Sequence, residues 1–360
     1  MSADTVISVD AMGGDKGPAV IFAGMNRALR DDPHLSFILH GPEAQLTRLL
    51  ARRRKLAGRV EVRHAPDSIA MDERPSRAVR GGRKSSLWKA LESVANGDAS
   101  AAFSAGNTGA IVALSMLVLR KAPGVDRPAI AVHWPARNAR GYNVALDMGA
   151  DIRADGKVLC QYAIMGAEYA RLAFGHENPR VGLLNIGAED TKGRQERHDA
   201  RRLLSELDRQ GDAAMDFCGF VEGNDFPGDN VDVIVTDGFT GNIALKAAEG
   251  TAAFIRGALH DAFRHSFLSR IGGLFALGPL NRMRRRIDPR RVNGGVFLGL
   301  NGGVVKSHGS ADAVGHASAI ALAAKIARQD LSGKVSRQLA NLDLDSIFDA
   351  LGEANGIDGK

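Results

Sequence analysis

Cysteine is scarce in this 360-residue sequence, which contains only Cys160 and Cys218. Two cysteines in a chain of this length argue against a disulfide scaffold and for a reducing compartment. Both lie in apolar segments, so we expect buried structural thiols rather than a nucleophile. The chain begins without a basic and then apolar leader, and it has no apolar run of membrane-spanning length. We therefore predict a cytoplasmic protein.

Several familiar ligand-binding motifs are also missing. Neither a G-x-G-x-x-G turn nor a G-x-x-x-x-G-K-[ST] loop occurs, so dinucleotide binding and P-loop chemistry are not indicated. The absence of a G-x-S-x-G elbow removes support for an acyl-serine intermediate. His308 and His316 have no cysteines beside them, so we expect no metal site. His308 is interpreted as a turn residue near the site and His316 as a helix-face residue.

Strand-like and helical segments alternate along the chain, which has 44% hydrophobic and 24% charged residues. Helical patterns include residues 158–174, 194–210 and 242–267. Short apolar strands separated by helices predict an α/β fold with a mainly parallel sheet covered on both faces. We expect one domain over residues 1–360. The strand-like runs are residues 6–9, 36–40, 60–63, 101–104, 129–132, 143–146, 180–184, 217–221, 231–235 and 296–300.

Four loops rich in glycine, asparagine and threonine follow four of these strands. They are residues 10–18, 104–110, 185–193 and 236–242. Taken alone, each loop is better explained as helix capping than as a ligand-binding site. A parallel sheet, however, would gather all four at the carboxyl edge where ligands bind. Their glycines, amides, hydroxyls and helix N-termini suit a phosphate bound beside a carbonyl oxygen.

Positive charge is concentrated in one segment. The chain carries a net charge of +6, but residues 264–291 hold eight arginines and one acid, so this segment alone is +7. It follows a helix with Ile255, Leu259, Phe263 and Phe267 on one face. We predict that residues 251–291 form a projecting helical excursion that contacts an anionic lipid surface. The alternative is a dimer-packing helix pair with a solvated basic tip, and both can hold. The expected membrane contacts are Leu274, Phe275, Leu277, Arg284, Arg285 and Arg286.

A second group of cations recurs at helical spacing at Arg74, Arg77, Arg80 and Lys84. It reads equally as a solvated stripe or as a contact for an acidic partner or phosphate. Aromatic residues make up 5% of the chain and are almost missing near the arginine-rich segment, so no nucleic acid is expected as a partner.

The run DAMGGDKGP at residues 10–18 resembles the bacterial phosphate acyltransferases. The resemblance continues through SAGNTGA, LLNIG…TKG, VTDGFTGNIALKAAEG and GGVFLGLNGGVVKSHGS, and so covers nearly the whole chain. It implies a Rossmann-like three-layer α/β/α fold, a homodimer, and peripheral membrane association. It also implies formation of acyl phosphate from acyl-[acyl-carrier protein] and inorganic phosphate for phospholipid synthesis. The sequence departs from the family pattern at Asp151, Ala188 and Ala311.

This chemistry needs positioning of phosphate and stabilisation of an oxyanion, and no metal or organic cofactor. We assign anion binding to Gly13 and Gly14, and neutralisation of the phosphate to Lys192. Asn107, Thr108 and Asn242 would donate hydrogen bonds, and Asp10, Asp15 and Asp237 would orient these donors. Ser104, Asn185, Thr240 and His308 complete the expected substrate and phosphate site.

Two other functions remain open at this point. A phosphate acyltransferase that uses an acyl-coenzyme A thioester would need the same loops. A non-catalytic protein that binds a lipid surface would explain the basic and apolar excursion, but it would leave the four polar loops without a role.

Overall fold

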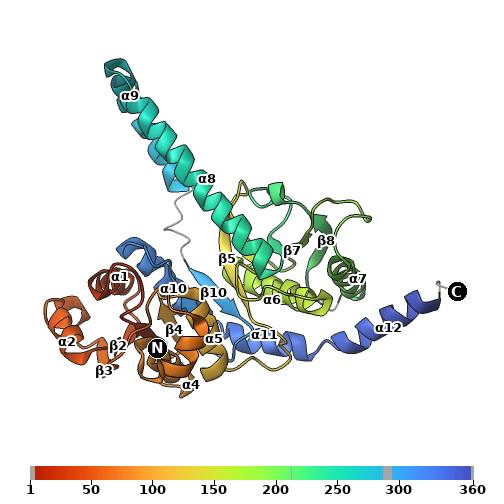
Figure 1. The fold of residues 1–360 in the computed structure, drawn as a ribbon, viewed down its shortest axis with the longest axis horizontal. Helices are drawn as coiled ribbons and strands as arrows, with labels where there is room; N and C mark the ends of the chain where they lie inside the picture. Colours follow the sequence, from red (N-terminus) through yellow and green to blue (C-terminus); the bar gives the residue numbers. More distant parts are fainter. Residues whose placement is uncertain (1–4, 212, 287–293, 358–360) are drawn as a thin grey trace.

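The computed structural model describes residues 5–211, 213–286 and 294–357, which form an 11-stranded sheet flanked by helices (Figure 1). The strand order is β3-β2-β1-β4-β11-β10-β5-β6-β9-β7-β8. Over the described residues, seven of the ten strand pairings are parallel. The predicted α/β fold with a mainly parallel sheet is confirmed.

The first half of the sheet is wholly parallel. It contains β1 (Thr5–Asp10), β2 (Leu35–Gly41), β3 (Val60–His64), β4 (Ala101–Ser104) and β11 (Gly303–Lys306). Strand β11 was not predicted from the sequence, and it lies between β4 and β10. The turns that follow β1, β4 and β11 therefore leave the sheet at the same edge.

The second half of the sheet begins with strands of alternating direction and ends with strands that run opposite to the first half. Strands β10 (Gly295–Leu298), β5 (Ala129–Pro135) and β6 (Tyr142–Leu146) are joined by antiparallel pairings. Strands β9 (Val233–Val235), β7 (Arg180–Leu184) and β8 (Asp216–Val221) are parallel to β6. Because three antiparallel pairings lie between them, β7 and β9 run antiparallel to β1 and β4. Their following loops therefore leave the opposite edge of the sheet, and the expectation that all four loops share one edge is wrong.

Helices cover both faces of this sheet (Figure 1). Helices α1 and α10 pack closely because Gly24 presents no side chain: a Cβ there would lie 2.6 Å from the Cβ of His316. The helices are α1 (Pro18–Asp31), α2 (Glu43–Ala51), α3 (Pro75–Gly81), α4 (Ser86–Ala95), α5 (Thr108–Val118), α6 (Gly156–Phe174), α7 (Gln195–Gln210), α8 (Gly238–Arg264), α9 (Phe267–Arg286), α10 (Ala313–Arg328), α11 (Leu331–Ala340) and α12 (Leu344–Ile357). Within the described residues, short 3-10 turns occupy Arg54–Leu56, Gly82–Lys84 and Gly223–Asp225.

The two cysteines lie in different environments. Cys160 is fully buried on α6, and burial raises the pKa of its thiol to about 12, which keeps it protonated. Cys218 on β8 is exposed, so the expectation of a buried thiol is wrong at this position. Strand β8 is the last strand of the sheet, and the alternation of its side chains sends Cys218 outward.

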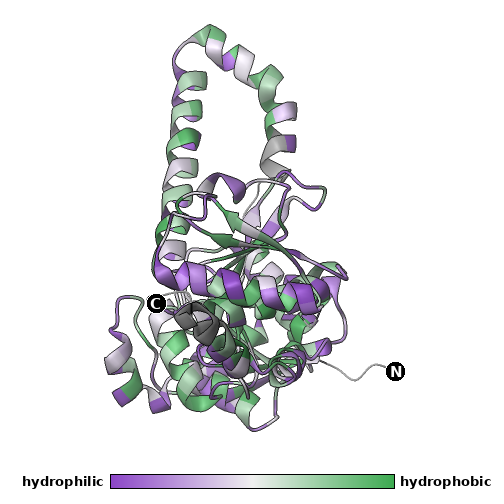
Figure 2. Ribbon diagram, turned by 90° about the vertical axis from the view of Figure 1, so that its right-hand side faces the viewer, coloured by the Kyte–Doolittle hydropathy of each residue, from purple (hydrophilic) through white to green (hydrophobic). Residues whose placement is uncertain are grey.

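Helices α8 and α9 form a hairpin that projects from the body of the protein (Figures 1 and 2). Its described side chains include strongly exposed apolar residues, among them Phe254 at 75% and Phe275 at 82%. Arg284, Arg285 and Arg286 form the last turn of α9, and their side chains lie outside the described residues, as do Arg290 and Arg291. Across the described part of the chain, every helix falls short of the length and apolarity needed to cross a membrane.

Candidate functional site

Asp10, at the end of β1, is the centre of a buried hydrogen-bond network. Its Oδ1 accepts a hydrogen bond from Ser86 Oγ at 2.6 Å, and its Oδ2 accepts one from Ser104 Oγ at 2.7 Å. The backbone N–H of Met12 also donates to the carboxylate, at 3.2 Å. Burial raises the pKa of the Asp10 carboxyl, and the hydrogen bonds from Ser86 and Ser104 oppose this shift. Asp10 and Ser104 thus join the turns that follow β1 and β4.

Glycine is required in the turn after β1. A Cβ at Gly13 would lie 2.7 Å from Asp10 Oδ2 and 2.8 Å from the backbone nitrogen of Gly106. Gly14 has a φ of 97°, a conformation that side chains disfavour. The N–H of Asp15 then donates to the carbonyl of Gly309 at 3.0 Å. The turns after β1, β4 and β11 therefore meet, and we call this group the β1–β4–β11 cluster.

Asn107 has a different task from the one predicted. Its Oδ1 caps α5 by accepting a hydrogen bond from the N–H of Ala110 at 3.0 Å. Its Nδ2 donates to the carbonyls of Met71 and Glu73 at 2.6 and 3.1 Å. Because both amide N–H groups are engaged, donation from Asn107 to a substrate oxygen is not supported by this geometry. The neighbouring Thr108 is half-buried in the first turn of α5.

Lys306, at the end of β11, was missed in the sequence analysis. Burial lowers the pKa of its ammonium group, while the nearby negative charges of Glu249 and Asp15 oppose that shift. The exposed His308 follows in the same turn, and its Nε2 lies 3.9 Å from Glu249 Oε1. Lys306 therefore places a cation beside the β1–β4–β11 cluster. The signal in the sequence was a lysine immediately after two apolar strand residues and before a glycine-containing turn.

Asp237 starts a second group of predicted site residues, at the N-terminus of α8. Its carboxylate accepts hydrogen bonds from the N–H and the hydroxyl of Thr240, at 2.9 and 2.8 Å, and from Arg197 of α7. Burial alone would raise the pKa of Asp237, but these hydrogen bonds and the charge of Arg197 lower it below its usual value. Asp237 thus caps α8 through Thr240 and forms an ion pair with Arg197. Sequence reasoning missed Arg197.

Lys192 lies in the loop between β7 and α7. Its carbonyl accepts a hydrogen bond from Asn185 Nδ2 at 2.9 Å, which fixes the loop. Its Nζ donates to Glu189 Oε1 at 2.8 Å, and this hydrogen bond raises the pKa of Lys192. The side chain is about half exposed (48%), so its ammonium group is accessible to an anion. We refer to these residues, with Asp237, Thr240 and Arg197, as the β7–β9 cluster.

The start of α8 rests on a buried carboxylate that the sequence analysis did not identify. Asp147 accepts hydrogen bonds from the backbone N–H groups of Ile130 and Asp151 at 2.9 and 2.7 Å. Burial raises the pKa of this carboxyl to about 6. A Cβ at Gly241 would lie only 1.9 Å from the Asp147 carbonyl oxygen, so glycine lets α8 approach this loop. Asn242 follows on α8 and is exposed.

The two clusters are connected by α8 rather than by a shared sheet edge. The helix begins beside Asp237, and its Glu249 reaches His308 of the β1–β4–β11 cluster. At 1.5 Å per residue, the segment from Gly238 to Glu249 is roughly 17 Å long. The structure therefore separates the predicted residues into two groups at the two ends of this segment.

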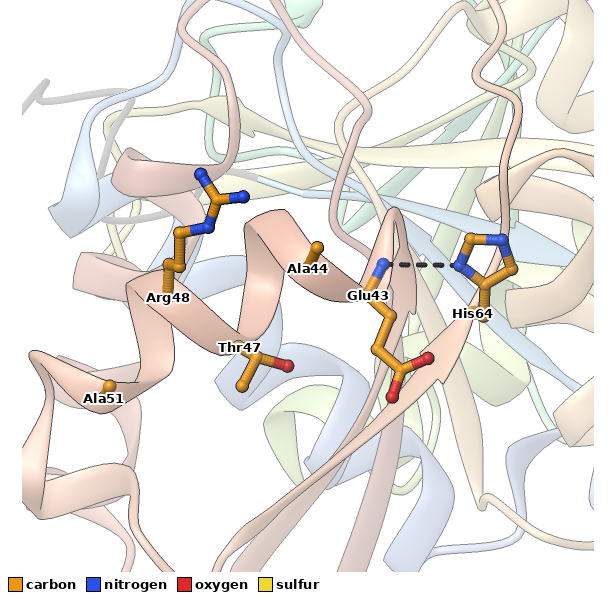
Figure 3. Close-up of a pocket in the computed structure, with 6 residues that line it drawn as sticks. All are labelled: Glu43, Ala44, Thr47, Arg48, Ala51 and His64. Carbon is orange, nitrogen blue, oxygen red and sulfur yellow. Dashed lines mark hydrogen bonds between the residues drawn. The ribbon is translucent and has the colours of Figure 1, made fainter.

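A shallow surface pocket lies elsewhere, between α2 and β3 (Figure 3). The backbone N–H of Glu43 donates to Nδ1 of His64 across it, at 3.4 Å. Its lining contains none of the predicted site residues, so we do not assign the function to it. Among the described residues, no group of three His, Cys, Asp or Glu side chains is arranged to hold a metal ion.

Residues 5–334 match the family model described as "Fatty acid synthesis protein". The chain is 55% identical over 351 residues to a phosphate acyltransferase of Paracoccus denitrificans, covering 98% of this chain and 93% of the relative. It is 55% identical over 337 residues to a phosphate acyltransferase of Ruegeria sp. strain TM1040, covering 94% and 89% of the two chains.

Two solved structures share the fold. A phosphotransacetylase from Streptococcus pyogenes superposes with a TM-score of 0.60 at 16% identity, over 91% of this chain and 94% of its own. EutD phosphotransacetylase from Staphylococcus aureus gives a TM-score of 0.56 at 15% identity, with the same coverage. The α/β fold and the close curated relatives define this chain as an acyltransferase enzyme. It belongs to the fatty acid synthesis protein family, whose relatives named above are phosphate acyltransferases.

Proposed function

We propose that this enzyme forms acyl phosphate from acyl-[acyl-carrier protein] and inorganic phosphate, as a step of phospholipid synthesis. The observation that carries the proposal is the meeting of three glycine-containing turns at Gly13, Gly14 and Gly309, beside the N-terminus of α5. Backbone N–H groups at turns and helix N-termini are suited to bind an anion. Lys306 adds a positive charge at the same place.

The reaction is a transfer of the acyl group from sulfur to oxygen. A phosphate oxygen attacks the thioester carbonyl carbon, a C–O bond forms, and the C–S bond breaks. The proton of the phosphate ends on the departing thiol. Because a thiol with a pKa of about 8.5 leaves readily, the enzyme mainly positions the phosphate and stabilises the oxyanion.

The β7–β9 cluster supports the second half of this proposal. This cluster lies roughly 17 Å along α8 from the turns that bind phosphate. Our assignment of phosphate neutralisation to the exposed ammonium of Lys192, and of donation to the carbonyl oxygen to Asn242 and Thr108, therefore requires the two clusters to approach each other around the bound substrates. Asp237 orients the start of α8 through Thr240, and Asp10 orients the turns that bind phosphate. Asp15, Ser104, Asn185 and His308 line or support these loops.

The direct test is an assay with purified protein, phosphate, and either acyl-[acyl-carrier protein] or acyl-coenzyme A, with acyl phosphate trapped as a hydroxamate. The proposal predicts a product that requires phosphate and forms preferentially from the carrier-protein thioester. Formation from acyl-coenzyme A alone would favour the alternative donor. If neither thioester gave product, the proposed reaction would be wrong.

We also propose a cytoplasmic homodimer that associates peripherally with anionic membranes through the α8–α9 hairpin. The described part of the hairpin exposes several large apolar side chains, which mark interaction surfaces when they gather on one element: Phe254, Phe267, Leu268, Leu274, Phe275 and Leu277. Pairing with a second copy would cover the α8 side, while Leu274, Phe275 and Leu277 would contact lipid. Arg284, Arg285 and Arg286 would supply the attraction to anionic headgroups.

Two measurements test the dimer and the membrane contact separately. Light scattering after size-exclusion chromatography should give twice the chain mass, and a monomer mass would contradict the dimer. In sedimentation with anionic vesicles, Leu274→Glu/Phe275→Glu should bind less than the native chain. Equal sedimentation would rule out this lipid contact.

A further inference from the structure

Five cations line one side of α3 and the turn that follows it. Arg74 precedes the helix, Arg77 and Arg80 lie on it, and Arg83 and Lys84 belong to the 3-10 turn Gly82–Lys84. We call these five residues the basic ridge. Residues 74–89, all of which the structure describes, carry six cations and no acid. The ridge is therefore a local surface of one sign.

The packing of α3 directs these cations toward solvent. Ala78 is buried at 1% exposure, and Val79 packs with it against the hydrophobic core. The Arg77 side chain, in contrast, is 83% exposed. Among the described residues, Arg77 is the one member of the ridge within 4 Å of a carboxylate, that of Glu73 at 3.8 Å. Most of the charge on the ridge is thus available to a partner.

The ridge is tied to the β1–β4–β11 cluster at both of its ends. Before α3, the carbonyls of Met71 and Glu73 accept hydrogen bonds from Asn107, which caps α5. After the ridge, Ser86 donates to Asp10, at the turn proposed to bind phosphate. The ridge therefore lies at the rim of the site that must receive the thioester.

From this placement we infer that the basic ridge is the docking surface for the acidic carrier protein that delivers the acyl thioester. This inference rests on the proposed function and names the surface that serves the same site. Carrier proteins of this kind are acidic, so the charges are complementary, and complementary surfaces accelerate and orient association. Docking at the rim would place the thioester arm next to the anion-binding turns.

A lipid surface fits the ridge less well than a protein does. Membrane-binding surfaces combine cations with apolar side chains that insert among the lipids. Residues 74–89 contribute no large apolar side chain to the exposed surface of the described chain, whereas α9 contributes several. The ridge and the hairpin therefore serve different partners.

The test uses the full chain with the double substitution Arg77→Glu/Arg80→Glu. Arg54→Glu/Lys55→Glu is the matched control, because these exposed cations lie in the 3-10 turn after α2, outside the hydrogen-bonded rim of the site. Binding of fluorescently labelled holo-carrier protein is measured by anisotropy, and acyl phosphate formation by steady-state kinetics. Vesicle sedimentation measures binding to lipid, and thermal unfolding shows whether each variant is folded.

We expect the ridge variant to raise Kd for the carrier protein and KM for its acyl form by about tenfold or more, with kcat within about twofold of the native value. The difference should shrink at high salt, because exposed charges are screened. The control variant should bind as the native chain does. Unchanged Kd and KM in the ridge variant would overturn the inference. So would a variant that loses only vesicle binding. A fall in kcat together with a lowered unfolding temperature would also overturn it, because the substitution would then act on folding rather than on docking.

The outcomes also separate this inference from the proposed reaction. If the native chain makes no acyl phosphate but binds the carrier protein through the ridge, the reaction is wrong and the docking surface stands. If the native chain is active and the ridge variant binds and turns over normally, the docking surface is wrong and the reaction stands.

Discussion

The hydroxyl of Ser86 donates a hydrogen bond of 2.6 Å to the carboxylate of Asp10, although the two residues are 76 positions apart in the sequence. The bond joins the start of α4 to the end of β1. With Ser104 on the other carboxylate oxygen, it holds Asp10 in place beneath the glycine turn. The shape of the proposed anion site therefore depends on a buried carboxylate that need not touch the substrate itself.

Asp10→Asn should weaken both stability and catalysis. The amide keeps the size of the side chain, but it turns one buried acceptor into a donor that faces a hydroxyl or a backbone N–H. Mismatched buried groups of this kind cost about 1–3 kcal/mol, so the free energy of unfolding should fall by that amount in urea titrations. Acyl phosphate formation should fall with it. Asp15→Asn, at an exposed position, is the control for stability. An equal fall in the free energy of unfolding in this control would argue against a special role for Asp10.

Asn107 should act on the segment before α3 rather than on substrate. Asn107→Ala removes the α5 cap and both tethers, and should cost about 1–2 kcal/mol. Asn107→Asp keeps the cap oxygen but loses the two donors to Met71 and Glu73. Hydrogen exchange of residues 70–74 should therefore accelerate in both variants. Unchanged exchange together with a large fall in kcat would restore the donor role predicted from the sequence.

Lys192→Ala should slow acyl transfer without unfolding the protein. Loss of one group that stabilises transition-state charge typically lowers kcat by about 100-fold or more. Glu189→Gln is the matched control, because it removes the ion-pair partner and keeps the cation. The control should stay active, and the KM for phosphate should rise mainly in the lysine variant. Native kinetics of Lys192→Ala would remove this residue from the proposed mechanism.

His316 should make the protein less stable in acid. Burial lowers the pKa of His316 from 6.5 to about 4, so the unfolded chain binds the proton first as the pH falls. Its contribution to stability is therefore complete above pH 6.5 and is lost as the pH falls from 6.5 toward 4. In His316→Gln, the change in unfolding free energy across this range should shrink by up to about 3 kcal/mol. The exposed His265→Gln should keep the native pH dependence, and parallel curves for His316→Gln and the native chain would contradict the account.

Much of the fold was predictable because buried strands and helix starts leave local signals. Each of the ten expected strand runs corresponds to a strand, and Asp237 caps α8 just before its predicted helical pattern. The direction of the second half of the sheet was not predicted. Only residues 136–141 connect β5 to β6, and residues 299–302 connect β10 to β11. Such short connections cannot make a parallel crossover, so hairpins reverse the chain there.

The residue types of the site could be predicted from the sequence, but the hydrogen-bond partners and neighbours of those residues could not. The glycine turn at Gly13–Gly14 and the cap residue Asn107 stand out in the sequence. Which atoms Asn107 bonds depends on Met71 and Glu73, more than 30 residues earlier, and no local pattern encodes that contact. Lys306 was missed for the same reason, because its charge becomes significant only when β11 inserts beside β4 and α8 approaches it.

The most direct test of the account is a crystal structure of the protein with bound phosphate. The account predicts an anion at the backbone N–H groups of the Gly13–Gly14 turn and the start of α5, with the Lys306 ammonium beside it. An anion found only elsewhere, such as at the basic turn Arg54–Leu56, with the Gly13–Gly14 turn empty, would contradict the assignment of this cluster as the phosphate site.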